Sequence, residues 1–230
     1  MTPATWGRAF LGAGVCLLLS CSFFSRQPPL PRHAAIEPTG SDKKFSSLIE
    51  DADIIYFPSE SVALGSRAEV AWKLLDAVRR HGGSFALGWD ETGNEEKHRD
   101  FLAEASKAGG EILTLRAPAQ GNANEMLRGF EPPPGDYERF ALQFASRELS
   151  EAKLRGMYET VLLAEQYAAA KIAAHFREHR GEKILVFVRR DHLGRDHGVP
   201  YFVAQKTKAR QLILNPQRHR DSAPGLLARN

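Results

Sequence analysis

The sequence predicts an α/β fold, in which a mainly parallel sheet is flanked by helices and a helical insertion precedes the C-terminal strands. Short apolar runs alternate with stretches of helical periodicity, and the connections between them are short. Repeated units of this kind favour parallel strands joined by crossover helices. One run, 184–188, is apolar throughout, as is typical of a strand that is buried on both faces.

The composition is that of an ordinary globular protein. The chain has 230 residues, 43% of them hydrophobic and 26% charged, with a formal net charge of +3. Its 31 cations and 28 anions are well mixed, and no basic stripe with interleaved aromatic residues stands out. The sequence therefore does not favour a nucleic-acid partner.

The N-terminus resembles the signal of a bacterial lipoprotein. Arg8 precedes an apolar run, 9–19, that has the length of a signal-peptide core and is short for a bilayer span. The run ends in the lipobox-like sequence Leu18-Leu19-Ser20-Cys21. We interpret 1–21 as a signal peptide that ends at a lipidated Cys21, which would carry acyl chains such as palmitate. An ordinary secretory signal is the alternative.

This signal places the protein in the bacterial cell envelope, and Ser22 after the cysteine favours the outer membrane. Cys16 would leave with the signal, so no intrachain disulfide is expected in the mature chain. The proline-containing range 22–44 is expected to be a flexible tether, 45–215 the folded domain and 216–230 a frayed tail.

Apolar periodicity predicts the elements of the domain in order. Strands are expected at 53–57, 84–88, 111–115, 183–188 and 209–214. Helices are expected at 66–80, 95–107, 137–150 and 151–180. The last two helices form the insertion, which we expect to make a wall or lid over the strand ends. Tyr201 begins an alternating stretch, which favours a half-buried strand there.

The strand at 183–188 runs into a polar loop, Arg189-Arg190-Asp191-His192-Leu193-Gly194. In open α/β sheets, ligands bind where the carboxyl ends of parallel strands open into loops. This loop is therefore the first candidate for a functional site.

Three segments together resemble the ChaN-like family of haem-binding, iron-regulated bacterial lipoproteins. They are Ile54–Phe57 with Ser59-Glu60, Ala86–Asp90, and Val186 to Gly198-Val199-Pro200. Leu113–Pro118 and the long helix at 158–172 are similar to further family segments. The resemblance covers about 50–214, and implies a fold related to erythromycin-esterase-like and TraB/Tiki-type proteins.

The chain departs from the family pattern in two loops. The first loop of the family reads Gly-Glu-x-His, and here it is Ser59-Glu60-Ser61-Val62, which keeps the acid and lacks the histidine. The second loop of the family ends in Glu, and here it ends in Asp90. The late loop keeps its histidine, His192.

Two residues are candidate ligands of haem iron. His192 could bind iron or another metal, or hydrogen-bond a propionate; alternatively it bonds local backbone. The phenolate of Tyr201 suits ferric haem, and the alternative is a packed strand tyrosine. We expect His197 at the surface, and at most one of Tyr158 and Tyr167 facing a cavity, because nine residues is two and a half helical turns.

Four charged residues complete the candidate site. The guanidinium groups of Arg189 and Arg190 suit haem propionates, although Asp191 could neutralise them locally. Glu60 and Asp90 are expected at the ends of neighbouring strands, where two carboxylates could bind a cation or share a proton. Alternatively, each stabilises the N-terminus of a following helix.

The function that the sequence favours is a lipid-anchored haem-binding protein of iron acquisition, with haem as cofactor and a second copy or an outer-membrane receptor as partner. A metal-dependent hydrolase that uses Glu60, Asp90 and His192 is one alternative, which the missing first-loop histidine disfavours. A non-catalytic envelope interaction protein is another. The chain has no Gly-x-Ser-x-Gly elbow, no glycine-rich phosphate loop and no His-Glu-x-x-His motif, and binding is favoured over catalysis.

Overall fold

The computed structural model describes residues 31–36, 42–62, 65–81, 83–90, 95–117, 129–194 and 196–216. The predicted signal peptide, its Cys21 and the tail after Pro216 lie outside the described residues. None of the helices in the described part of the chain is long and apolar enough to cross a membrane.

All six strands form one parallel sheet in the order β1-β6-β2-β5-β3-β4. The strands are β1 (Arg32–Ile36), β2 (Ile54–Pro58), β3 (Phe85–Trp89), β4 (Gly110–Thr114), β5 (Lys183–Val188) and β6 (Gln211–Pro216). The helices are α1 (Asp42–Glu50), α2 (Gly65–Arg80), α3 (Glu95–Lys107), α5 (Asp136–Leu142), α6 (Glu151–Glu178) and α7 (Gly198–Lys206), with short 3₁₀ turns η1 (Ser59–Ser61) and η2 (Arg190–His192). The predicted α/β class and the helical insertion between β4 and β5 are confirmed.

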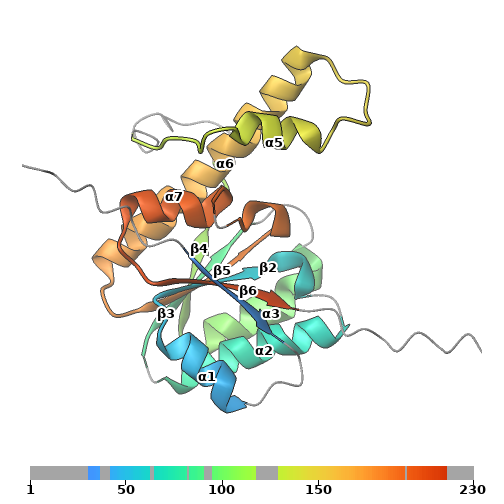
Figure 1. The fold of residues 1–230 in the computed structure, drawn as a ribbon. Coiled ribbons are helices and arrows are strands. Elements are labelled where there is room, and N and C mark those ends of the chain that lie inside the picture. The colour runs from blue at the N-terminus through green and yellow to red at the C-terminus, as the bar shows by residue number, and fades with distance from the viewer. Residues whose placement is uncertain are drawn as a thin grey trace, which may run out of the picture.

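The sheet is the middle of three layers (Figure 1). Helices α1, α2 and α3 pack on one face, and α6 and α7 on the other. The side chains of β5 alternate between the two cores, with Leu185 and Phe187 in the first and Val186 and Val188 in the second. Because β5 lies between β2 and β3 and is buried on both faces, its continuous apolar run is explained.

Strand β1 corrects the prediction of a tether over 22–44. Residues Arg32–Ile36 pair in parallel with β6 at the edge of the sheet, and α1 begins at Asp42. A short edge strand needs few apolar residues, because one of its sides has no neighbouring strand and its faces are only partly covered.

Helix α7 corrects the prediction of an alternating strand at Tyr201. Pro200 is the third residue of this helix, and the first turn of a helix tolerates proline because its N–H groups have no helical acceptor. The first insertion helix also ends earlier than expected, at Leu142.

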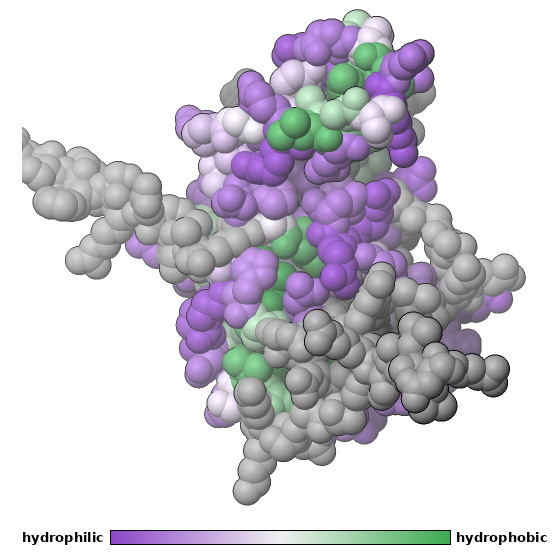
Figure 2. Space-filling model, turned by 45° about the vertical axis from the view of Figure 1, so that its right-hand side comes forward, coloured by the Kyte–Doolittle hydropathy of each residue, from purple (hydrophilic) through white to green (hydrophobic). Residues whose placement is uncertain are grey.

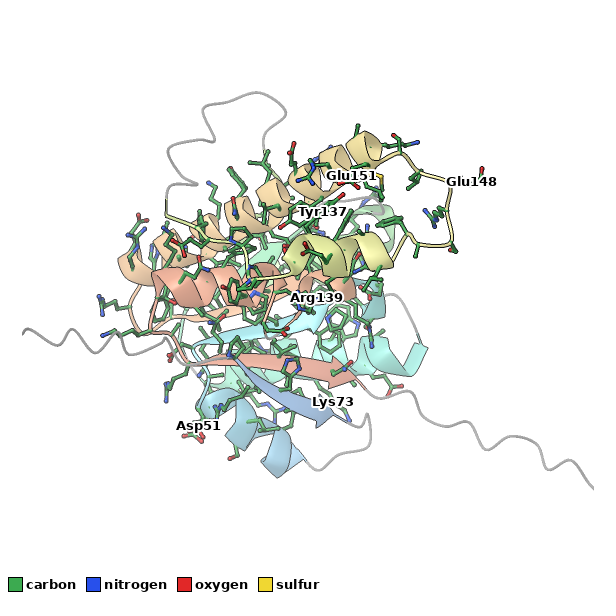
Figure 3. All side chains as sticks on the ribbon, turned by 45° about the horizontal axis from the view of Figure 1, so that its top comes forward. Asp51, Lys73, Tyr137, Arg139, Glu148 and Glu151 are labelled. Atoms are coloured by element: carbon green, nitrogen blue, oxygen red, sulfur yellow. The ribbon has the colours of Figure 1, made fainter. Side chains whose placement is uncertain are left out.

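The insertion stands above the strand ends, where α5 lies across the N-terminal half of α6 (Figures 1 and 3). The Tyr137 hydroxyl on α5 donates to Glu151 Oε1 on α6 at 2.7 Å. The Tyr158 hydroxyl on α6 donates to Asp136 Oδ2 on α5 at 3.0 Å. These two bonds, made in opposite directions, hold the two helices together.

Candidate functional site

A cavity of about 330 Å³ lies where the carboxyl ends of β3, β4 and β5 meet α6. We call it the larger cavity. Its wall is largely apolar and includes Leu115, Val161, Leu163 and Val188. Its charged or titratable residues are Asp90, Arg116, Glu165, Arg189 and His192.

A second cavity of about 250 Å³, the smaller cavity, lies between α5, α6 and the loop after β5. Phe140 of α5 and Phe144, just after this helix, form part of its wall. Four residues line both cavities: Val161, Glu165, Arg189 and His192. The Glu165 and His192 side chains therefore lie between the larger and the smaller cavity, at the strand ends where the sequence predicted a site.

Glu165 and His192 form a hydrogen-bonded pair, with Glu165 Oε1 2.7 Å from His192 Nδ1. Their side chains are only 9% and 15% exposed. Burial raises the pKa of the Glu165 carboxyl, and the bond to His192 opposes that rise. Burial lowers the pKa of His192, but the bond to Glu165 and its negative charge outweigh burial, so the pKa of His192 is raised overall.

The hydrogen bond to Glu165 determines whether the other ring nitrogen of His192, Nε2, has a lone pair for a ligand. A proton on Nδ1 that is donated to Glu165 leaves a lone pair on His192 Nε2. The nearest carboxylate to Nε2 is Asp191, at 3.9 Å, too far for a hydrogen bond. A carboxylate behind the opposite nitrogen orients the ring and makes it a stronger base toward a metal.

The backbone holds both partners in place. Glu165 lies midway along α6, which the adjacent buried residues Ala168, Ala169 and Ile172 pack against the sheet. Gly198, the first residue of α7, has φ of 71°, and a Cβ there would lie 2.3 Å from the His192 carbonyl oxygen. Only glycine therefore allows α7 to start directly against the His192 backbone.

The arginines of the late loop have different positions. Arg189 lines both cavities. Its Nε donates to Asp191 Oδ1 at 3.2 Å, which matches the alternative prediction that Asp191 neutralises this arginine locally. Arg190 lines neither cavity. Its backbone N–H donates to Glu60 Oε2 at 3.3 Å, and its Nη1 donates to Asn215 Oδ1 at 3.1 Å, so it connects the loops after β2 and β5 to β6.

The expectation that Glu60 and Asp90 end neighbouring strands is wrong. Glu60 follows β2 and Asp90 follows β3, and β5 lies between these strands. Asp90 lines the larger cavity, whereas Glu60 lines neither cavity and accepts from Arg190. Neither of these two cavities therefore brings together the three residues of the hydrolase alternative, Glu60, Asp90 and His192.

The tyrosines also differ from expectation. Tyr201 lies half-buried on α7, edge-to-face with Phe202 at 5.4 Å between ring centroids, and lines neither cavity. Tyr158 lines the smaller cavity and Tyr167 is buried without lining either one. Burial and the nearby Asp136 raise the pKa of Tyr158, which keeps its phenol protonated.

His197 lies at the surface, with 33% of its side chain exposed. Its Nδ1 lies 2.8 Å from Asp196 Oδ1, and its ring lines the smaller cavity.

Two site residues were not identified from the sequence, Glu165 and Arg116. Glu165 falls in the apolar stripe of its helix, and a charged residue in such a stripe is a signal for a buried partner. Arg116 follows β4 directly, in the position where strand-end ligands bind.

No protein-family model matches the chain, and no curated protein matches it. Among solved structures, ChaN of Campylobacter jejuni, described as showing cofacial haem binding, has a similar fold. The TM-score is 0.56 at 11% sequence identity, over 76% of this chain and 85% of that one. At this identity the likeness shows a shared fold. It agrees at the level of the fold with the resemblance that the sequence motifs indicate.

Proposed function

We propose that this protein binds haem in the larger cavity, with His192 as the axial ligand. The observation that carries the proposal is the Glu165–His192 pair at the wall of an apolar cavity at the strand ends. Haem is a flat apolar macrocycle with two carboxylates, so it needs an apolar slot, an axial ligand and nearby cations. His192 Nε2 supplies the ligand, and Arg116 and Arg189 supply the cations.

A second copy of the chain is the partner that we favour for closing the site. The larger cavity is small for a binding site of this kind, so part of a porphyrin would extend beyond it. Hydrophobic side chains gather over the upper part of the molecule, around α5 and α6 (Figure 2). On these helices Leu142 of α5 is 74% exposed, and Leu163 of α6, at the larger cavity, is 39% exposed. The cofacial haem of the structural neighbour fits such an arrangement, and an outer-membrane receptor is the alternative partner.

We further propose a lipid anchor at Cys21, an outer-membrane location and a role in haem or iron acquisition. The lipobox-like sequence and Ser22 support the anchor and its location. A protein that carries haem in the envelope needs no catalytic nucleophile, and the sequence has no Gly-x-Ser-x-Gly elbow.

The experiment is a visible-absorption titration of the full chain, purified in detergent, with ferric haem. Detergent without protein is the baseline, because micelles dissolve haem. We expect a saturating Soret shift at one haem per chain that His192→Ala abolishes. Tyr201→Phe is the matched control and should leave the shift unchanged, because Tyr201 lines neither cavity. Spectra that match haem in detergent throughout contradict the proposal.

A further inference from the structure

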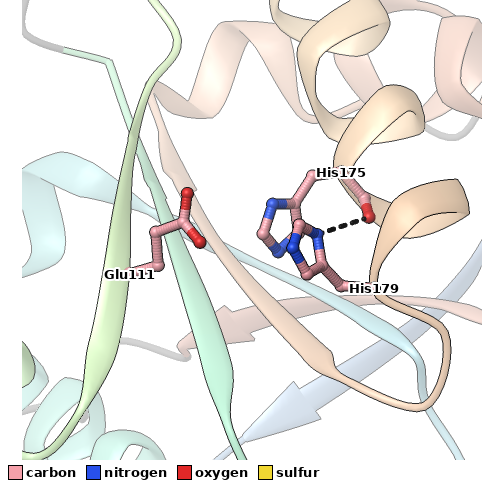
Figure 4. A group of neighbouring side chains, drawn as sticks. All are labelled: Glu111, His175 and His179. Carbon is pink, nitrogen blue, oxygen red and sulfur yellow. Dashed lines mark hydrogen bonds between the residues drawn. The ribbon is translucent and has the colours of Figure 1, made fainter.

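A second group of metal-ligating side chains lies at the other end of α6, away from both cavities (Figure 4). His175 lies in the last turn of α6, His179 follows four residues later as the residue that ends the helix, and Glu111 lies on the edge strand β4. One ligand atom from each residue lies within 4.8 Å of the others. Figure 4 shows the Glu111 carboxylate pointing from the strand toward the two rings. Ten residues of helix, roughly 15 Å, separate His175 from Glu165.

The hydrogen bonds around the two imidazoles leave one nitrogen of each ring free. His175 Nε2 lies 2.7 Å from Glu182 Oε2, and both side chains are less than a tenth exposed. His179 Nδ1 lies 3.3 Å from the His175 carbonyl oxygen, which can only accept. A proton on each of these nitrogens leaves a lone pair on His175 Nδ1 and on His179 Nε2.

The two rings are stacked, with centroids 4.1 Å apart and planes 24° apart. In the described part of the chain the Glu111 side chain takes part in no ion pair or hydrogen bond, so its carboxylate is available.

We propose that Glu111, His175 and His179 bind a divalent transition-metal ion of the Zn²⁺ type, with Glu182 orienting the His175 ring. Two imidazoles and one carboxylate, with water in the fourth position, form a common tetrahedral zinc set. The carboxylate behind His175 is the partner that metal-binding histidines usually have. Zinc bonds of about 2.0–2.2 Å require ligand atoms roughly 3.5 Å apart. The ligand atoms lie within 4.8 Å of one another, so binding would draw them together and turn the rings, and the exposed Glu111 and His179 side chains are the ones that would move.

The test is a titration of the metal-free full chain in detergent with Zn²⁺, and with Co²⁺ as a spectroscopic probe. The protein carries no oligohistidine tag, because a tag would bind the same ions. We expect one ion per chain and visible d–d absorption of four-coordinate Co²⁺. His179→Ala and Glu111→Gln should each weaken binding by ~10-fold or more. Both residues are exposed, so neither change should cost folding, which thermal melting verifies.

Two controls separate this site from other histidines. His81→Ala removes an equally exposed imidazole at the end of α2, and His192→Ala removes the proposed haem ligand. Both variants should bind Zn²⁺ like the unchanged chain. Binding that persists in His179→Ala, binding lost with His81→Ala or His192→Ala, or no saturable binding at one ion per chain would each overturn the proposal. None of these results depends on haem.

Discussion

Helix α6 supports two buried histidine–carboxylate pairs, Glu165–His192 and His175–Glu182, each at 2.7 Å. The pairs differ in what lies beyond the imidazole. His192 lines two cavities at the carboxyl ends of the strands. His175 faces a second histidine and the Glu111 carboxylate beside the edge strand.

This difference separates two kinds of binding. Beside His192 the cavity wall is mostly apolar, with Arg116 and Arg189 on it, which suits a large flat ligand that needs one axial bond. Converging oxygen and nitrogen atoms around His175 leave room only for a single ion. The same kind of orienting pair would thus support the proposed haem pocket at one place on the helix and the proposed metal site at another.

The largest expected effect comes from disturbing the packing of α6 on the sheet, because both histidine–carboxylate pairs depend on the position of this helix. Ala169 is fully buried between them where α6 meets the sheet, so Ala169→Leu should push the helix outward. We expect a loss of about 1–3 kcal/mol in the free energy of unfolding and weaker binding of both haem and Zn²⁺. Denaturant unfolding and the two titrations measure this. Ala152→Leu, on an exposed position of the same helix, is the control and should change neither quantity.

The second prediction tests whether each carboxylate affects only the binding site of its own histidine. Glu165→Gln should weaken haem binding by about 10–100-fold and spare Zn²⁺, and Glu182→Gln should do the reverse, because each carboxylate orients only its own histidine. Both variants are measured in both titrations. Equal losses in both titrations for either variant would show that the pairs do not act separately.

The smallest effect is a pH dependence of haem binding that Glu165 controls. Glu165 raises the pKa of His192, and an imidazolium has no lone pair for iron. Haem affinity should therefore be constant above that raised pKa and fall as the pH drops below it, by at most tenfold per pH unit. In Glu165→Gln the pKa of His192 is no longer raised by a carboxylate, so the fall should begin at a lower pH. A midpoint that does not move would contradict the role given to Glu165.

The order of strands and helices was largely predictable, because the spacing of apolar residues and the length of apolar runs depend directly on which faces of an element are buried. Strand β1 was not, because Arg32–Ile36 pairs on one side only and carries little of the core. Helix α7 was not, because Pro200 in its first turn conceals the helical pattern. The sheet order was not either, since β5 enters between β2 and β3 only through long-range packing.

The site was predictable in part. His192 and Arg189 were found because strand-end loops bind ligands, and both line the cavities. The partner of His192 is 27 residues earlier in the chain, and sequence spacing cannot reveal such a contact. The spacing of His175 and His179 is a visible helical signal, but Glu111 joins them only because β4 lies beside the end of α6.

Strand β1 also sets how the domain would face a bilayer. Arg32 begins this parallel strand, so it lies at the amino-terminal rim of the sheet, opposite to the two cavities. If Cys21 carries acyl chains as proposed, the 11 residues to Arg32 span at most roughly 40 Å of fully extended chain. The amino-terminal rim would then lie within that distance of the lipid, and the two cavities would lie at the opposite end of the sheet from the attachment point.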